Sequence, residues 1–222
     1  GGSNDILQWD TSNVVNFSDM FRQSIYGADS FQRPILSSSS NWSFASATNT
    51  SNMFGGITDT QNFTNGGVGI ELYFGTAGRS INMSNMFQDQ GSIAVSIDIT
   101  LPIVPCAITA EDTFIGCSYD GAQLGDIDIR NLVNPSWGSF NDSGLTQANM
   151  EDALVDWFAQ PTCPDNLAFI AEHLYVPLLN TPAGAAYTGL VSKGWTFTLM
   201  AGPMAMSWEQ TVSNDILVIP LG

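Results

Sequence analysis

Few residues in this sequence could perform catalytic chemistry. His173 is the only histidine, and no Gly-x-Ser-x-Gly segment provides the exposed nucleophile of an α/β hydrolase. A catalytic triad with His173 is conceivable, but a surface or helix histidine is the favoured interpretation. The 21 acidic residues contain many carboxylate pairs of the kind that glycosidases use, and nothing in the sequence distinguishes one pair from the others. We therefore predict no catalytic residue and no enzyme, and keep a carbohydrate-active enzyme only as a third interpretation.

Metal-binding patterns are equally sparse. Cys106, Cys117 and Cys163 show no CxxC spacing and no histidine partner, so we expect no zinc site. Asp126-Ile127-Asp128 and Glu151-Asp152 carry the oxygen ligands that calcium accepts, but neither matches a known calcium loop, and solvated or helix-capping acids are favoured. We expect no cofactor, with calcium left open. The odd cysteine count excludes a complete disulfide framework and permits a single bridge, for which Cys106–Cys117 is the favoured pair.

Composition limits the class of partner. The 222 residues are 44% hydrophobic, which supplies enough apolar surface for a folded core, but only 12% of them are charged. Acidic residues outnumber basic ones 21 to 5, and the resulting net charge of −16 disfavours nucleic acid and anionic lipid as partners. No apolar run is long enough to span a bilayer, so we expect no membrane insertion. A low charge content is typical of secreted and virion-surface β-rich proteins.

A repeated segment supplies the elements that would position any functional residue. The segments that end at Phe21, Phe54 and Phe87 share the sequence Ser-(Asp/Asn)-Met-Phe, and their final phenylalanines are 33 residues apart. Weaker copies end at Phe114 and Leu154. We predict that the recurring apolar positions have structural roles; they are Trp9, Val14, Phe17, Met20, Phe21, Trp42, Met53, Phe54, Met86, Phe87, Phe114 and Leu154.

Each repeat is expected to be a strand, a turn and a short helix. Residues 6–9 form a plausible strand, residues 11–13 could cap a helix, and the apolar residues of 14–21 recur at the spacing of one helix face. One such unit cannot bury its apolar face alone, so stacked neighbours must create the core. Further along, period-two alternation predicts a strand over 93–104. Helices are predicted over 149–159 and from 165 to about 175.

The unit Trp9-Asp10-Thr11-Ser12-Asn13-Val14, with Met20-Phe21 and the turn Gly27-Ala28-Asp29-Ser30-Phe31 after it, resembles the BspA-like surface-protein repeat. This variant of the leucine-rich repeat occurs in bacterial and mycoplasma surface proteins and in some phage proteins. The resemblance implies an α/β repeat solenoid, a stack of short strands and short helices with a helical C-terminal cap and terminal β-strands. It also implies three parts: degenerate repeats over 5–160, a helical and strand cap over 161–200, and a linker with the opening strands of a following module over 201–222.

Four aromatic residues in expected loops are the candidate binding residues, because exposed rings can stack against a carbohydrate or protein ligand; they are Tyr26, Tyr73, Tyr119 and Trp137. We predict an extracellular or virion-surface module for recognition or adhesion, which binds a protein or glycan on a cell surface through its loops. The alternative is a structural subunit of a phage tail fibre, capsid decoration or surface filament. Such a subunit would bind neighbouring copies of the same protein.

Overall fold

The computed structural model describes residues 9–22, 42–56, 69–89, 97–133 and 137–201, together with the backbone of 62–63 and 92–93. The strands of this part of the chain are β1 (Asn62–Phe63), β2 (Ile70–Tyr73), β3 (Ile81–Asn82), β4 (Ser92–Ile93), β5 (Ile97–Thr100), β6 (Ile108–Thr109), β7 (Trp137–Ser139), β8 (Ala168–Tyr175) and β9 (Thr196–Met200). Its helices are α1 (Gln147–Ala159) and α2 (Pro182–Ser192).

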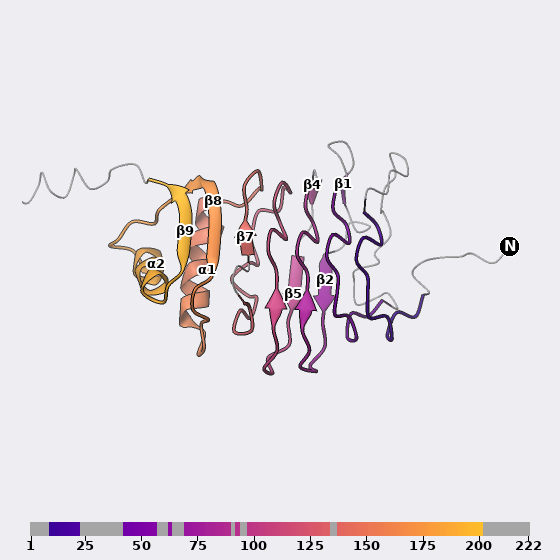
Figure 1. Ribbon diagram of the computed structural model, residues 1–222. Coiled ribbons are helices and arrows are strands. Elements are labelled where there is room, and N and C mark those ends of the chain that lie inside the picture. The colour runs from indigo at the N-terminus through magenta and orange to yellow at the C-terminus, as the bar shows by residue number, and fades with distance from the viewer. Residues whose placement is uncertain are drawn as a thin grey trace, which may run out of the picture.

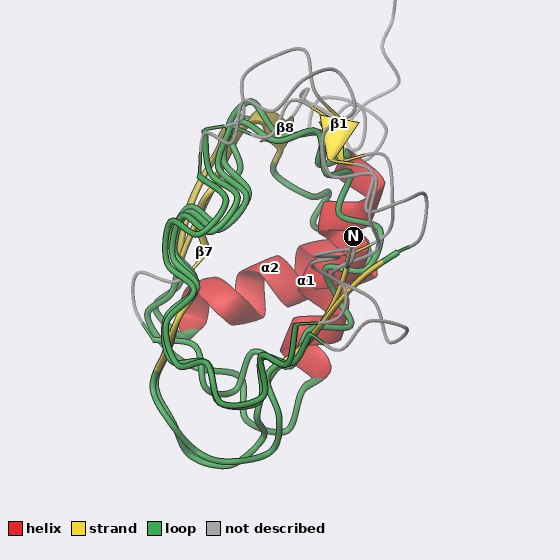
Figure 2. Ribbon diagram, turned by 90° about the vertical axis from the view of Figure 1, so that its right-hand side faces the viewer, coloured by secondary structure: helices red, strands yellow, loops and turns green. Residues whose placement is uncertain are grey.

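The chain winds into successive coils that lie on one another (Figure 1). Every strand pair is parallel: β1 with β4, β2 with β5, β3 with β6, and β7 with β8 and then β9. Single parallel bridges also join Asn16 to Asn49 and Asn49 to Asn82. Figure 2 looks along the stack, and the coils superpose there into one ring. The apolar core fills this ring, because alternate side chains of each coil point inward.

The repeated Asn-x-Ser sequence forms one and the same turn in three coils. The Oδ1 atom of Asn49 accepts a hydrogen bond from the backbone N–H of Ser51 at 3.0 Å, and equivalent bonds join Asn16 to Ser18 and Asn82 to Ser84. A short polar side chain that bonds the backbone two residues ahead stabilises a turn in competition with helix. The motif is therefore a turn signal.

The next residue of the motif bends the chain into the left-handed region. Asp19, Asn52, Asn85 and Asp112 have φ angles of 53–56°, which Asp and Asn tolerate better than most side chains. Gly138 takes this position in the fifth coil with φ 54°, where a Cβ atom would lie 2.5 Å from the Asp112 carboxylate. The predicted helix over 14–21 is therefore wrong. The bent backbone instead donates hydrogen bonds to the next coil, as from the Phe54 N–H to the Met86 carbonyl at 2.9 Å.

One aromatic ring from each coil packs on the ring of the next. We call this set the phenylalanine column; it consists of Phe21, Phe54, Phe87, Phe114, Phe140, Phe169 and Phe197. Neighbouring ring centroids are 5.0–5.9 Å apart. The fifth member was expected to be Leu154, and this alignment is wrong, because Leu154 is buried on α1 and Phe140 takes the position.

The wall that faces away from the repeated turns changes along the stack. In the middle coils it holds β2 and β5, and in the last coils it holds α1, while α2 runs across the ring (Figure 2). The predicted helix over 149–159 is confirmed by α1, which Thr146 caps by accepting a hydrogen bond from the Asn149 N–H. The predicted helix over 165–175 is wrong. This segment contains β8, in which Phe169 and Ala171 alternate inward between two neighbouring strands.

Several other predictions can be compared with the structure. Of the strand expected over 93–104, β4 contains Ile93 and β5 contains Ile97–Thr100, while residues 94–96 lie outside the described residues. Residues 101–104 are not part of a strand, and Ile103 is exposed. All three cysteines are free, so no Cys106–Cys117 bridge exists. Trp9 and Met20 were expected in packed positions but are exposed, although the Trp9 ring stacks on Trp42 at 6.1 Å. The expected strands of 201–222 lie outside the described residues, except for Ala201.

Candidate binding surface

The structure separates the four predicted binding aromatics. Tyr119 and Trp137 were expected on exposed loops, and this expectation is wrong, since only 2% and 1% of their surfaces are exposed. The Tyr119 ring packs on Phe114 at 4.8 Å, and Trp137 packs on Trp157 at 5.7 Å. Both side chains belong to the core where the stack changes from strands to helices. Burial also raises the pKa of the Tyr119 hydroxyl. Tyr26 lies outside the described residues.

Tyr73 is the described member of the set that remains available to a ligand. It ends β2 with 52% of its surface exposed. The register of β2 and β5 places Tyr73 beside Thr100 and Glu71 beside Asp98, and all four side chains point outward. The outer face of β2 and β5 therefore presents an aromatic ring and two carboxylates. We call these four residues the β2–β5 face.

The inner side of the same strands is firmly held. Ile70, Leu72, Ile97 and Ile99 are buried and alternate with the residues of the β2–β5 face. Burial of an aliphatic side chain of this size contributes about 1.5–3 kcal/mol each. The strands can therefore keep their register without help from Tyr73.

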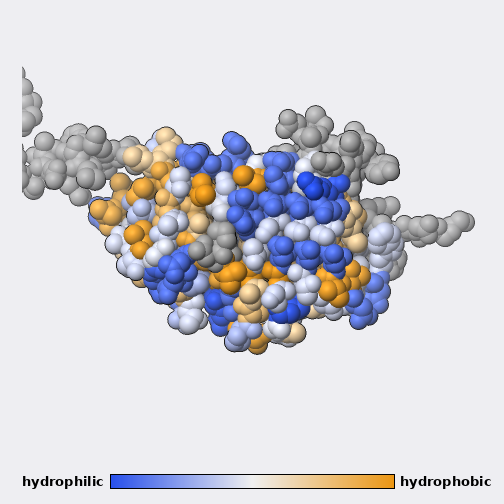
Figure 3. All heavy atoms as spheres, in the orientation of Figure 1, coloured by the Kyte–Doolittle hydropathy of each residue, from blue (hydrophilic) through white to orange (hydrophobic). Residues whose placement is uncertain are grey.

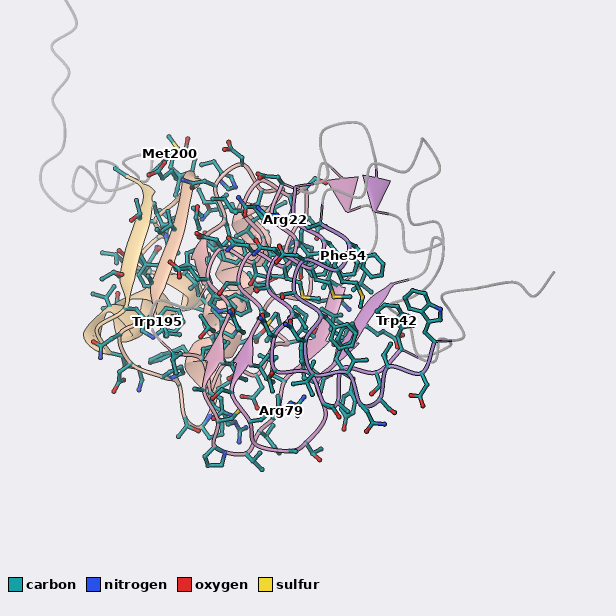
Figure 4. The ribbon with its side chains drawn as sticks, turned by 45° about the vertical axis from the view of Figure 1, so that its right-hand side comes forward. Arg22, Trp42, Phe54, Arg79, Trp195 and Met200 are labelled. Carbon is teal, nitrogen blue, oxygen red and sulfur yellow. The ribbon has the colours of Figure 1, made fainter. Side chains whose placement is uncertain are left out.

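The loop that follows Tyr73 is fixed by Arg79, which lies among the loops at one side of the stack (Figure 4). The Arg79 guanidinium donates hydrogen bonds to the carbonyls of Phe44 and Ala47 in the preceding coil and to those of Phe74 and Ala77 in its own loop. Partial burial lowers the pKa of Arg79. A planar fork of five N–H groups suits this multiple bonding better than the single ammonium of lysine.

The loop that follows β5 is fixed in a similar way. Asn131, from the next coil, donates hydrogen bonds through Nδ2 to the carbonyls of Pro102 at 2.7 Å and Val104 at 2.8 Å. The Cβ position of Gly78 lies 2.9 Å from the Pro105 carbonyl oxygen, so the two loops also touch each other. The β2–β5 face is thus bordered by two loops with defined backbone positions.

A second polar feature is an open hollow of about 250 Å³ lined by Asn141, Asp142, Glu172 and His173. The side chain of Asn141 donates to the Glu172 carboxylate at 3.0 Å and accepts from the Glu172 N–H at 2.8 Å. The Nε2 atom of His173 lies 3.0 Å from the Leu145 carbonyl, and the imidazole is exposed. None of these four side chains is a hydroxyl or thiol nucleophile, so the hollow offers polar contacts and not the parts of a catalytic triad.

The acidic residues suggested as calcium ligands do not converge. Asp128 pairs with Arg130 at 2.9 Å, and Glu151 accepts a hydrogen bond from Gln147. Asp126 and Asp152 are exposed. In the described part of the chain, no three His, Cys, Asp or Glu side chains are grouped as a metal site would require.

Sequence reasoning missed the carboxylate pair of the β2–β5 face. A signal was present, because Ile-Glu-Leu-Tyr at 70–73 and Ile-Asp-Ile-Thr at 97–100 share one alternation. Their separation equals that of Phe87 and Phe114, which places the two segments in register on adjacent coils.

A known family model matches part of the chain. Residues 3–99 match the family model described as Mycoplasma protein of unknown function, DUF285. This segment spans the first three members of the phenylalanine column and most of the β2–β5 face. No curated protein matches the chain, and no solved structure matches it. Among the described residues, neither helix has the length and apolar character needed to cross a bilayer.

Proposed function

We propose that this chain is a repeat solenoid of the leucine-rich-repeat type and acts as an extracellular or virion-surface recognition module. The β2–β5 face is its contact surface, and the partner is a protein or glycan on a cell surface. The exposure of Tyr73 on a strand whose other face is fully packed carries the proposal. A large ring held on a rigid strand binds with little loss of side-chain entropy, which is a common property of recognition surfaces.

The charges of the face indicate the chemistry of the partner. Glu71 and Asp98 are adjacent in register on a chain of net charge −16. The net charge of −16 gives the chain an overall negative field, which attracts cationic groups. The favoured partner is therefore a protein that presents lysine or arginine beside a surface on which Tyr73 can stack. Exposed charge pairs are screened over about 8 Å at physiological ionic strength, so binding should weaken as salt is added.

The experiment is a binding assay of the fluorescently labelled chain on host cells and on glycan arrays. We expect Tyr73→Ala to lower affinity at least tenfold with no change in the midpoint of thermal unfolding. Thr100→Ala is the matched control, because it shortens the neighbouring exposed side chain of the same face and should change affinity less than threefold. Equal binding by the Tyr73→Ala variant and the wild-type chain would contradict the proposed contact surface.

A structural, self-assembling subunit is the second candidate, and one observation favours it. Exposed apolar side chains gather at the C-terminal end of the stack, where a neighbouring copy could pack; they include Leu178, Leu179, Val191 and Met200. Size-exclusion chromatography with light scattering separates the two candidates. A monomer at micromolar concentration favours the recognition module, and a filament or closed oligomer favours the structural subunit.

A further inference from the structure

The C-terminal end of the stack carries very few charged residues. Lys193 is the only Asp, Glu, Lys or Arg between Glu172 and Glu209, although the chain has 26 such residues. Neither α2 nor β9 contains one. Figure 3 shows hydrophobic colours gathered over this end, whereas hydrophilic colours dominate the upper part of the stacked coils. Such a surface has the composition of a buried face.

The burial of β9 supports the same conclusion. Phe169 and Ala171 of β8 are completely buried, and their register partners on β9 are Phe197 and Leu199. These two partners pack against the core but are only partly buried. The difference arises because β8 lies between β7 and β9, while β9 has one neighbour among the described strands. An uncovered edge of this kind presents unpaired backbone donors and acceptors to any extended segment.

The chain contains a segment with the properties needed to cover this edge. Residues 216–219 are Ile-Leu-Val-Ile, a run with high strand propensity. The five residues Ser213–Leu217 also repeat Ser3–Leu7 without a change, and Ser3–Leu7 precede the first coil of the stack. A segment that precedes the first described coil in the sequence therefore recurs after the last described coil.

The connection is long enough for a parallel strand. Fourteen residues separate Met200 from Asp215. A parallel strand must return along the five residues of β9, a distance of about 17 Å at about 3.3 Å per residue. A connection of this length also gives an effective concentration in the millimolar range, which favours the chain's own segment over a second copy at micromolar concentration.

We propose that Ile216–Ile219 adds to the free edge of β9 as a parallel strand and covers Phe197 and Leu199. The segment continues the strand order of β7, β8 and β9 by one further strand. This inference is independent of the β2–β5 face and of its partner. It assigns the apolar end of the stack to an intramolecular contact.

Hydrogen exchange of the full chain, followed by mass spectrometry, tests the proposal. Leu217→Asp/Ile219→Asp and Ile216→Asp/Val218→Asp change opposite faces of the proposed strand. We expect one pair to increase exchange of the β9 amides at least tenfold, because its side chains face the core, and the other pair to have a clearly smaller effect. Met204→Asp/Met206→Asp is the control outside the strand and should leave β9 exchange unchanged.

Protection of the α1 amides in every variant shows that the stack stays folded. Equal exchange of the β9 amides in the wild-type chain and both pairs would overturn the proposal, since the edge would then be uncovered. Light scattering gives the other contrary outcome: a wild-type dimer that dissociates in one of the pairs would identify a second copy as the occupant. Loss of Tyr73-dependent binding would leave this result unaffected, so the two proposals can fail separately.

Discussion

The left-handed turn of the repeat predicts which of two variants, Asn85→Gly or Asn85→Ala, is the more stable. A helix at this position would give the opposite order. Asn85 has φ 56°, donates its N–H to the Glu111 carbonyl at 2.9 Å, and accepts the Gln88 N–H at its own carbonyl at 3.1 Å. Both hydrogen bonds use backbone atoms, so they survive the substitutions Asn85→Gly and Asn85→Ala. The two variants then differ mainly in the cost of a left-handed backbone.

That cost can be estimated. A residue with a Cβ atom pays about 1–2 kcal/mol in the left-handed region, and glycine avoids it. We expect Asn85→Gly to be within about 0.5 kcal/mol of the wild-type chain and Asn85→Ala to be about 1–2 kcal/mol less stable than Asn85→Gly. In a helix the order would reverse, because alanine is about 1 kcal/mol better than glycine there.

Urea unfolding followed by tryptophan fluorescence measures the difference. Gln88 is the matched control, since it lies in the same turn without a positive φ, and Gln88→Gly should be less stable than Gln88→Ala. For a chain of this size, 1 kcal/mol corresponds to about 2–4 °C in the unfolding temperature. An Asn85→Ala variant as stable as Asn85→Gly, or more stable, would refute the turn assignment.

Three further predictions follow from packing and burial. Phe87→Ala should lower the free energy of unfolding by about 3–5 kcal/mol, because the ring is completely buried between two members of the phenylalanine column. Phe21→Ala, at the end of the column, should lower it less, and urea unfolding compares the two variants. Arg79→Lys should destabilise nearly as much as Arg79→Ala in the same assay, since one ammonium cannot replace a fork bonded to four carbonyls. Burial raises the pKa of Cys117 from 9.0 to about 12, so the thiol holds its proton more tightly in the folded state than in the unfolded state. The free energy of unfolding should therefore fall as the pH rises from about 9 towards 12. An equally steep fall for the Cys117→Ala variant would exclude this contribution.

The repeat could be found from sequence because its spacing follows from the stack itself. Phe21, Phe54 and Phe87 recur at equal intervals, since each must meet the same position of the next coil. The column loses this regularity after Phe87, where coil length varies with the loops. The alignment of Leu154 with Phe21 depended on the similar residue types of 149–154 and 16–21. Burial and contact across coils, and not local similarity, identify Phe140.

The secondary structure of the repeat could not be derived from apolar spacing alone. Phe17 and Phe21 are four residues apart, which suits a helix face, but the bend at Asp19 brings both rings inward from a turn. Asp and Asn serve equally as helix caps and as left-handed residues, so the sequence does not separate the two roles. In β8, helix-favouring residues such as Ala168 and Glu172 concealed an alternating strand whose partners lie far away in sequence.

The binding surface was only partly predictable for a related reason. The sequence places three aromatic residues in expected loops without distinguishing exposed from buried rings: Tyr73, Tyr119 and Trp137. The geometry of the coils decides which ring points outward. Tyr73 lies at an outward position of a two-strand face, whereas Trp137 fills the widening core beside Trp157. The fixing of the adjacent loop by Arg79 depends on carbonyls from two coils, and no local pattern shows that contact.

Because of the phenylalanine column, the length of the stack depends on the number of coils and not on the number of residues in each coil. Coils of unequal residue number all advance the stack by one ring, and each ring adds 5.0–5.9 Å. Residues added to a loop widen a coil but do not lengthen the stack, whereas one additional phenylalanine-bearing coil extends it by a fixed step. The number of rings in the column therefore sets the length of the stack. A loop that gains or loses residues can therefore leave the number of coils, and with it the length of the stack, unchanged.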